Sequence, residues 1–170
     1  MSLRKPKSIP KIPKTRKKKI HTALSAIPTK KPDKLEYICK AFYKYDDTVK
    51  KQYSVFALET VAEFTSFSYE VSVEIFKEKN TINLVIMGLK AKLNSVPQIM
   101  PARKEILFED LIGDFLVNVV KQDGAINSAE FHLNIYKKEI LLKKEFKPKK
   151  KNNRLFCKFK VVEEDFSFPK

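Results

Sequence analysis

Residues 67–75 have the sequence FSYEVSVEI, and this stretch decides the fold class. A large apolar or aromatic side chain stands at every odd position from Phe67 to Ile75, and Ser or Glu stands at every even one. A period of two is typical of a β-strand that buries one face. Lys77–Asn80 is typical of a turn and Ile82–Leu89 of a returning strand, so the stretch predicts a β-hairpin.

Similar patterns extend outward in both directions and predict an all-β domain. Short strands with polar connections, about seven to nine of them, are typical of an antiparallel β-sandwich or a partly closed barrel. The later strands are expected to form an antiparallel meander. Turns are expected at Asp46–Thr48 and Gln122–Gly124, and Pro97 and Pro101 mark a loop. Further strands are expected at 35–45, Tyr53–Leu58, Ile106–Phe108, Asp114–Lys121, Phe131–Tyr136, Ile140–Phe146, Leu155–Val162 and Phe166–Phe168.

Two segments leave an α+β fold open as the alternative. Asp33 and Glu36 have the spacing of a helix capping box, and apolar residues follow at helical spacing. The segment 104–121 also places apolar residues on one helical face. Gly113 interrupts that face, and the residues after it are rich in β-branched side chains, which favours a strand. The alternative fold has helices near 33–45 and 104–121.

The charge of the chain is concentrated at its amino-terminal end. The net charge is +15, and residues 1–34 contribute twelve Lys or Arg against one acid, which is +11. Five of the nine prolines also lie there, with no aromatic residue and no glycine. Proline and like-charge repulsion favour extended chain over helix or sheet. We therefore expect a disordered or extended basic arm at 1–34 and a β-rich globular domain at 35–170.

Few residues of the chain point to catalysis. The three glycines stand far apart, so the sequence contains neither a P-loop nor a dinucleotide-binding fingerprint. Only His21 and His132 are histidines, and Cys39 and Cys157 are expected to be reduced thiols of the core. A dyad of Cys157 with His132 is geometrically conceivable, but nothing in the sequence orients the imidazole. We expect no enzyme, no metal site, no cofactor, no small-molecule substrate and no transmembrane segment.

Lysine-rich segments point instead to a polyanionic partner. Thirty-one of the thirty-five cations are Lys, which suits phosphate neutralisation better than base recognition. A second concentration of cations surrounds the expected loop after residue 146, and Phe156 is a candidate for stacking on a base. The candidate nucleic-acid-binding residues are Arg4, Lys5, Lys7, Lys11, Lys14, Arg16, Lys17, Lys18, Lys19, Lys30, Lys31, Lys147, Lys149, Lys150, Lys151, Arg154, Phe156 and Lys158.

These features predict a non-enzymatic RNA-associated protein, in the cytoplasm or in the nucleus of a eukaryote. A compact domain with an extended basic arm suits a structural component or associate of a ribosome-like ribonucleoprotein, where other proteins of a large complex are further candidate partners. RNA is favoured over DNA. The alternative is a protein–protein interaction module whose arm contacts an anionic surface, either DNA or a membrane. An enzyme whose site has no sequence signature is the third hypothesis.

Overall fold

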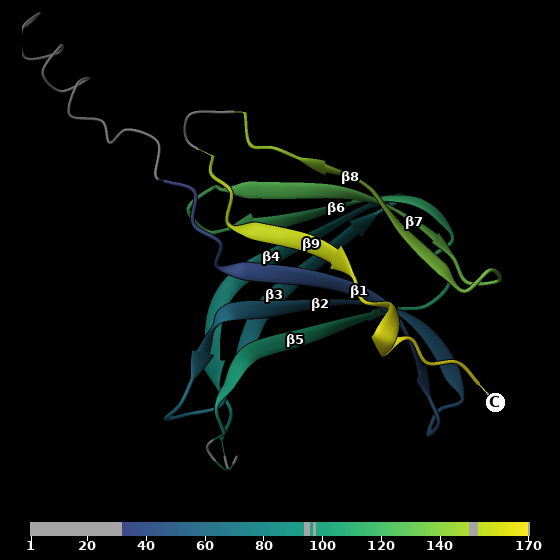
Figure 1. Cartoon of the computed structure of the whole chain (residues 1–170), viewed down its shortest axis with the longest axis horizontal. Coiled ribbons are helices and arrows are strands. Elements are labelled where there is room, and N and C mark those ends of the chain that lie inside the picture. Colours follow the sequence, from purple (N-terminus) through teal and green to yellow (C-terminus); the bar gives the residue numbers. More distant parts are fainter. Residues whose placement is uncertain (1–31, 94–95, 97, 150–152, 170) are drawn as a thin grey trace, which may run out of the picture. The chain divides into compact units, whose positions relative to one another are not determined.

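The folded domain consists almost entirely of β-strands. The computed structural model describes residues 32–93, 96, 98–149 and 153–169, so the predicted arm lies almost wholly outside the described residues. Within them, a short 3₁₀ helix (η1, Glu163–Asp165) accompanies nine strands (Figure 1). The strands are β1 (Tyr37–Asp46), β2 (Lys51–Phe64), β3 (Tyr69–Glu78), β4 (Thr81–Ala91), β5 (Met100–Phe108), β6 (Gly113–Lys121), β7 (Ile126–Asn134), β8 (Glu139–Phe146) and β9 (Cys157–Val161).

Two mixed sheets pack face to face, which confirms the expected β-sandwich. One has the strand order β5-β2-β1-β9 and the other has the order β3-β4-β6-β7-β8. Two strand pairs, β1 with β9 and β4 with β6, are parallel, so the expectation of an antiparallel sandwich is wrong for these two pairs, and β9 does not continue the expected meander. After β4 the chain crosses to the other sheet, forms β5 there and returns to form β6. Because of this crossover, β6 can lie beside β4 and run in the same direction.

The two segments that left a helical alternative open are strands, so that alternative is wrong. β1 occupies the first, and β5 and β6 occupy the second, with a turn around Leu111 between them. Pro101 lies within β5 rather than in a loop. Proline is tolerated there because β5 is an edge strand of its sheet. Pro97 lies outside the described residues.

The predicted hairpin turns are present, whereas the last predicted strand is not. The segment Gln122–Gly124 connects β6 to β7, and Gly124 has φ +84°, a value that favours glycine. Residues Phe166 and Phe168 follow η1 without forming a strand. Their rings lie 5.3 and 5.6 Å from that of Tyr43, so they cover the end of the core.

The core forms where the inward faces of the two sheets meet. Phe131 of β7 is fully buried, and its ring lies 5.3 Å from Phe56 of β2 and 6.1 Å from Phe159 of β9. The same side chain therefore contacts two strands of the opposite sheet. Such edge-to-face packing adds to the free energy gained from burying each ring.

Both margins of the sandwich are bridged, so the two sheets approach a closed barrel. At one margin Lys104 of β5 forms an ion pair with Glu70 of β3. At the other margin Glu145 of β8 accepts a hydrogen bond of 2.9 Å from the backbone N–H of Phe159 in β9. These contacts occupy polar groups at edge strands, which would otherwise be open to pairing with other chains.

Phe131→Ala is expected to lower the free energy of unfolding by about 3–5 kcal/mol, because it leaves a cavity between the two sheets. Urea denaturation at neutral pH measures the change. Tyr136→Ala is the matched control, since Tyr136 is 86% exposed in the turn after β7 and its loss should change stability by about 0.5 kcal/mol or less. Equal effects of the two substitutions would contradict this account of the core.

Candidate nucleic-acid interface

The sequence-predicted binding residues fall into two groups. Lys147, Lys149, Arg154, Phe156 and Lys158 lie in the described part of the chain. The others lie outside the described residues, and they are Arg4, Lys5, Lys7, Lys11, Lys14, Arg16, Lys17, Lys18, Lys19, Lys30, Lys31, Lys150 and Lys151.

Residues 33–37 are held against the segment that leads into β9. The backbone N–H of Leu155 donates a hydrogen bond of 2.8 Å to Asp33 Oδ1, and Lys34 N–H donates one of 3.0 Å to the carbonyl of Leu155. The N–H groups of Glu36 and Tyr37 both donate to the carbonyl of Phe156. Residues 1–31 therefore join the folded domain a few residues from the basic segment that follows β8.

Arg154 is buried and serves the fold, so its predicted phosphate contact is corrected. Its Nη2 atom lies 2.7 Å from Glu36 Oε1 and 3.8 Å from Asp123 Oδ2. Lys121 forms an ion pair with the same Glu36. Burial alone would raise the pKa of Glu36, but the hydrogen bonds from Lys121 and Arg154 outweigh it and leave that pKa lowered. Arg154 thus fastens the start of β1 to the segment before β9.

Phe156 is buried as well, which contradicts its predicted role in base stacking. Its side chain is fully inaccessible to solvent. Lys121 Nζ lies 5.6 Å and Arg154 Cζ 5.9 Å from the centroid of its ring. The ring therefore packs beneath the two cations and offers no free face to a ligand.

Phe146, which the sequence analysis did not select, is the exposed aromatic residue beside the basic segment. It ends β8, its side chain is 40% exposed, and Lys144 Nζ lies 4.8 Å from its ring centroid. The strand period could have indicated it, because Lys144 and Phe146 are two residues apart on one strand and share a face. An exposed ring with a cation over it suits stacking on a nucleobase.

Lys158 and Lys160 lie on the outer face of β9, two residues apart. Both are exposed, and they pair in register with Ile38 and Lys40 of β1. Lys40 forms an ion pair of 2.8 Å with Glu59 of β2. Within the described residues, no acidic side chain forms an ion pair with Lys158 or Lys160, so their charges remain available to a ligand.

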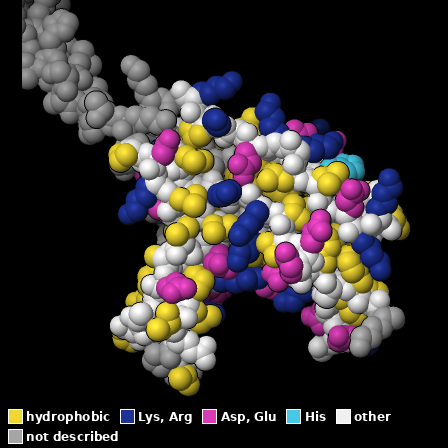
Figure 2. All heavy atoms as spheres, in the orientation of Figure 1, with side chains coloured by type: hydrophobic (Ala, Val, Ile, Leu, Met, Phe, Trp, Pro, Cys, Tyr) yellow, Lys and Arg dark blue, Asp and Glu magenta, His cyan; other side chains and the backbone are white. Residues whose placement is uncertain are grey.

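These side chains form a surface that we call the basic corner, and its members are Lys144, Phe146, Lys147, Lys149, Lys158 and Lys160. Strands β8 and β9 come together there through the bond from Phe159 to Glu145. All five lysines are exposed. Two acids lie among them: Glu145 already accepts a backbone hydrogen bond, and Glu130 pairs in register with Lys144. Blue and magenta side chains alternate over the neighbouring sheet face in Figure 2.

The histidine and cysteine of the conceivable dyad have other surroundings. His132 Nδ1 lies 2.6 Å from Asp114 Oδ1, and Lys143 contacts the same oxygen at 2.7 Å. Cys157 is buried in the core, where desolvation raises the pKa of its thiol. Burial likewise raises the pKa of Cys39 to about 12. Both cysteines are free thiols kept in their unreactive, protonated form.

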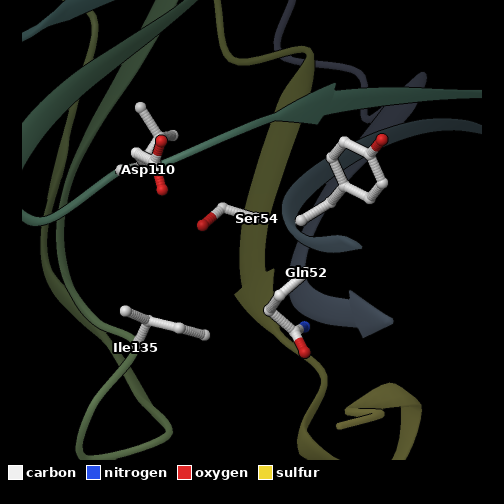
Figure 3. A pocket seen from close by; sticks show the side chains of 6 residues that line it. Gln52, Ser54, Asp110 and Ile135 are labelled. Carbon is white, nitrogen blue, oxygen red and sulfur yellow. The ribbon is translucent and has the colours of Figure 1, made fainter. Parts of the chain in front are cut away.

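A small polar cavity lies at one end of the sandwich and is shown in Figure 3. Gln52, Ser54, Asp110 and Ile135 are among its lining residues, and its volume is about 50 Å³. Gln52 Oε1 is buried and has no hydrogen-bond partner among the described residues. A cavity of this volume with an unpaired oxygen suits an ordered water rather than a substrate. No cluster of three potential metal-ligating side chains occurs among the described residues.

No protein-family model, no curated protein and no solved structure matches this chain. Among the described residues, no helix has the length and apolar character needed to cross a membrane. The surfaces described above are therefore the basis for inferring a function.

Glu36→Gln is expected to lower the free energy of unfolding by about 2 kcal/mol at pH 7, somewhat less than for a fully buried ion pair, since Glu36 is 26% exposed. The folded-state pKa of Glu36 lies below its ordinary value of 4.5, so its stabilisation is present above that pH and is lost as the pH falls through the folded-state pKa. Urea titrations at a series of pH values should show the difference from the natural chain shrinking below about pH 4.5. Exposed Glu74→Gln is the control, and a pH-independent difference would contradict the ion pair.

Proposed function

We propose that this chain is a non-enzymatic RNA-binding protein that acts as a structural component or associate of a ribonucleoprotein particle. One observation carries the proposal. Residues 1–31, with their run of cations, join the domain at Asp33 and Lys34, and these residues are hydrogen-bonded to the segment that connects the basic corner to β9. In this proposal the lysines of residues 1–31 and those of the basic corner neutralise phosphates of the same nucleic acid.

Electrostatics supplies the affinity in this proposal. Five lysines against Glu145 and Glu130 give the basic corner a net charge of +3, and residues 1–34 add +11. Lysines that neutralise phosphates release condensed counterions, and this release drives binding without requiring a particular base sequence. The scarcity of arginine fits contacts that position a backbone rather than contacts that recognise bases.

RNA is preferred over DNA because of the form of the basic segments. An extended, proline-containing arm can follow the irregular backbone of a folded RNA, and an exposed aromatic ring can stack on an unpaired base. Two free thiols suit a reducing compartment, which in this proposal is the cytoplasm or the nucleus of a eukaryote.

Replacing Lys147, Lys149, Lys158 and Lys160 together with Gln is expected to weaken binding to purified ribosomes and to total cellular RNA. The slope of log affinity against log salt should fall by about 0.7 for each phosphate that the variant no longer neutralises, or about 3 in all. Sedimentation between about 50 and 200 mM salt measures that slope. The matched control replaces Lys77, Lys79, Lys137 and Lys138 with Gln, since these exposed lysines lie near the end of β3 and in the β3–β4 and β7–β8 turns, away from the basic corner.

Deleting residues 1–31 is the complementary variant. It keeps Asp33 and Lys34, whose hydrogen bonds to Leu155 belong to the domain, and its unfolding midpoint should match that of the full chain. If the Gln variant and its control bind equally, the basic corner is not the interface. If the full chain fails to bind at low salt, the RNA-binding proposal is wrong, and an interaction module for another protein becomes the better hypothesis.

Phe146→Ala is expected to reduce affinity for a single-stranded oligonucleotide by about 1 kcal/mol or more, the loss typical of one stacked base. Phe146→Trp should retain or increase the affinity, because indole also stacks. Fluorescence anisotropy with a labelled oligoribonucleotide measures both variants. Phe76→Ala is the control, since Phe76 is 53% exposed on β3, at the opposite edge of the same sheet. Equal losses at Phe146 and Phe76 would contradict stacking at the basic corner.

A further inference from the structure

Two connections at one end of the sandwich expose large apolar side chains. Phe67 lies between β2 and β3, whereas Leu93, Val96 and Ile99 lie between β4 and β5. Their side chains are 61%, 88%, 77% and 70% exposed, in that order. We call these four residues the apolar tip. Connections on a protein surface are ordinarily polar, so an apolar cluster of this kind marks an interaction site.

Backbone pairing brings the two connections together. Lys92 N–H donates a hydrogen bond of 2.9 Å to the carbonyl of Ser68, which places Leu93 beside Phe67. In the other sheet Phe64 pairs with Met100, the residue after Ile99. Figure 2 shows yellow side chains gathered at the end where these connections lie in Figure 1.

The apolar tip lacks charge, although charged residues make up 32% of the chain. The sequence contains no Asp, Glu, Lys or Arg from Phe64 to Tyr69 or from Leu93 to Ala102. The four exposed apolar side chains themselves carry no charge, and charged side chains begin behind them, which suits an apolar medium bordered by charged headgroups.

Lysines surround Glu70 immediately behind the apolar tip. Lys104 forms an ion pair with Glu70 and donates a hydrogen bond to its carboxylate. This hydrogen bond is the main cause of the lowered pKa of Glu70, and the charges of Lys92 and Lys90 lower that pKa further. Glu70, Lys90 and Lys104 line a cavity of about 220 Å³ between the ends of β3, β4 and β5. Glu63 is also exposed at this end, where it pairs with Pro101, so three lysines against two glutamates leave this region with a net charge of +1.

We propose that the apolar tip inserts into the interface of an anionic membrane, with Lys90 and Lys92 at the level of the lipid phosphates. Lys90 lies three residues before Leu93, and three residues of extended chain span about 10 Å. That length matches the depth of about 5–10 Å at which peripheral apolar surfaces enter the boundary between headgroups and acyl chains. The cytoplasmic leaflet is negatively charged, so the compartment that suits the free thiols also offers the complementary surface.

This inference does not depend on RNA binding, because none of its residues belongs to the basic corner. Anionic vesicles would attract the basic arm in any case, so the test must report on the apolar tip itself. The chain contains no tryptophan, and a single substitution therefore introduces a unique fluorophore. Leu93→Trp places it in the apolar tip, and Tyr136→Trp places it at an equally exposed position in the turn after β7.

Each full-length Trp variant is mixed with vesicles of equal parts phosphatidylcholine and phosphatidylglycerol, and separately with vesicles of phosphatidylcholine alone. For Leu93→Trp, the anionic vesicles should shift the emission to shorter wavelength, and brominated acyl chains should quench it. The emission of Tyr136→Trp should stay unchanged. The triple variant Leu93→Ser, Val96→Ser and Ile99→Ser of the natural chain should bind the anionic vesicles about tenfold or more weakly. The unfolding midpoint of this variant should match that of the natural chain.

Three results would overturn the proposal. The first is that the protein sediments with anionic vesicles but the emission of Leu93→Trp does not change. That result would mean that the basic arm alone binds the membrane. The second is an equal shift at both positions. The third is a shift that grows with protein concentration in the absence of vesicles, which would identify a second copy of the chain as the occupant.

Discussion

The parallel pairing of β1 with β9 is the contact on which the rest of the domain depends. β1 lies between β2 and β9, so this pairing completes the four-stranded sheet. The partners Cys39 and Phe159 are about 120 residues apart in the chain, and closing a loop of that length costs entropy that later contacts must offset. The ion pair between Glu36 and Arg154 and the buried ring of Phe156 provide such contacts beside the pairing. The same pairing fixes the position at which the amino-terminal residues leave the domain.

Local pattern was sufficient to place the nine strands of the described residues approximately, although it also predicted a strand at Phe166–Phe168 that does not form. It did not predict the direction in which two pairs of strands associate. The alternation from Phe67 to Ile75 and the turn at Gln122–Gly124 are properties of neighbouring residues, and both the strand and the turn form. The strand begins only at Tyr69, however, and of the alternating apolar residues Val71 is buried whereas Phe67 and Ile75 are exposed. A strand sequence does not encode the direction of its partner. The parallel pairs β1/β9 and β4/β6 follow from where the chain crosses between sheets, which depends on packing over the whole domain. For the same reason Pro101 could not be assigned to an edge strand before the strand order was known.

The candidate interface could be predicted as a segment but not as individual side chains. Composition identified the cations around residues 143–160. The charge of a side chain alone does not show whether it faces solvent, as the lysines do, or forms a buried ion pair with an acid, as Arg154 does. Arg154 was misassigned because its partner, Glu36, is far away in the sequence. Phe156 and Phe146 differ in burial because one lies under Lys121 and Arg154, whereas the other ends an edge strand. The apolar tip was missed because its two connections meet only in the folded chain.

The position of β9 also has a consequence for synthesis on the ribosome. Translation produces β1 and the basic segment before it long before β9, so during that interval β1 has an open edge with unpaired backbone groups. Strand pairing between distant segments is slow, and nascent chains with open edges are prone to pair with one another. The lysines that precede β1 carry like charges on every nascent chain and oppose such encounters. Repulsion between these lysines therefore opposes pairing between nascent chains while the sheet is incomplete.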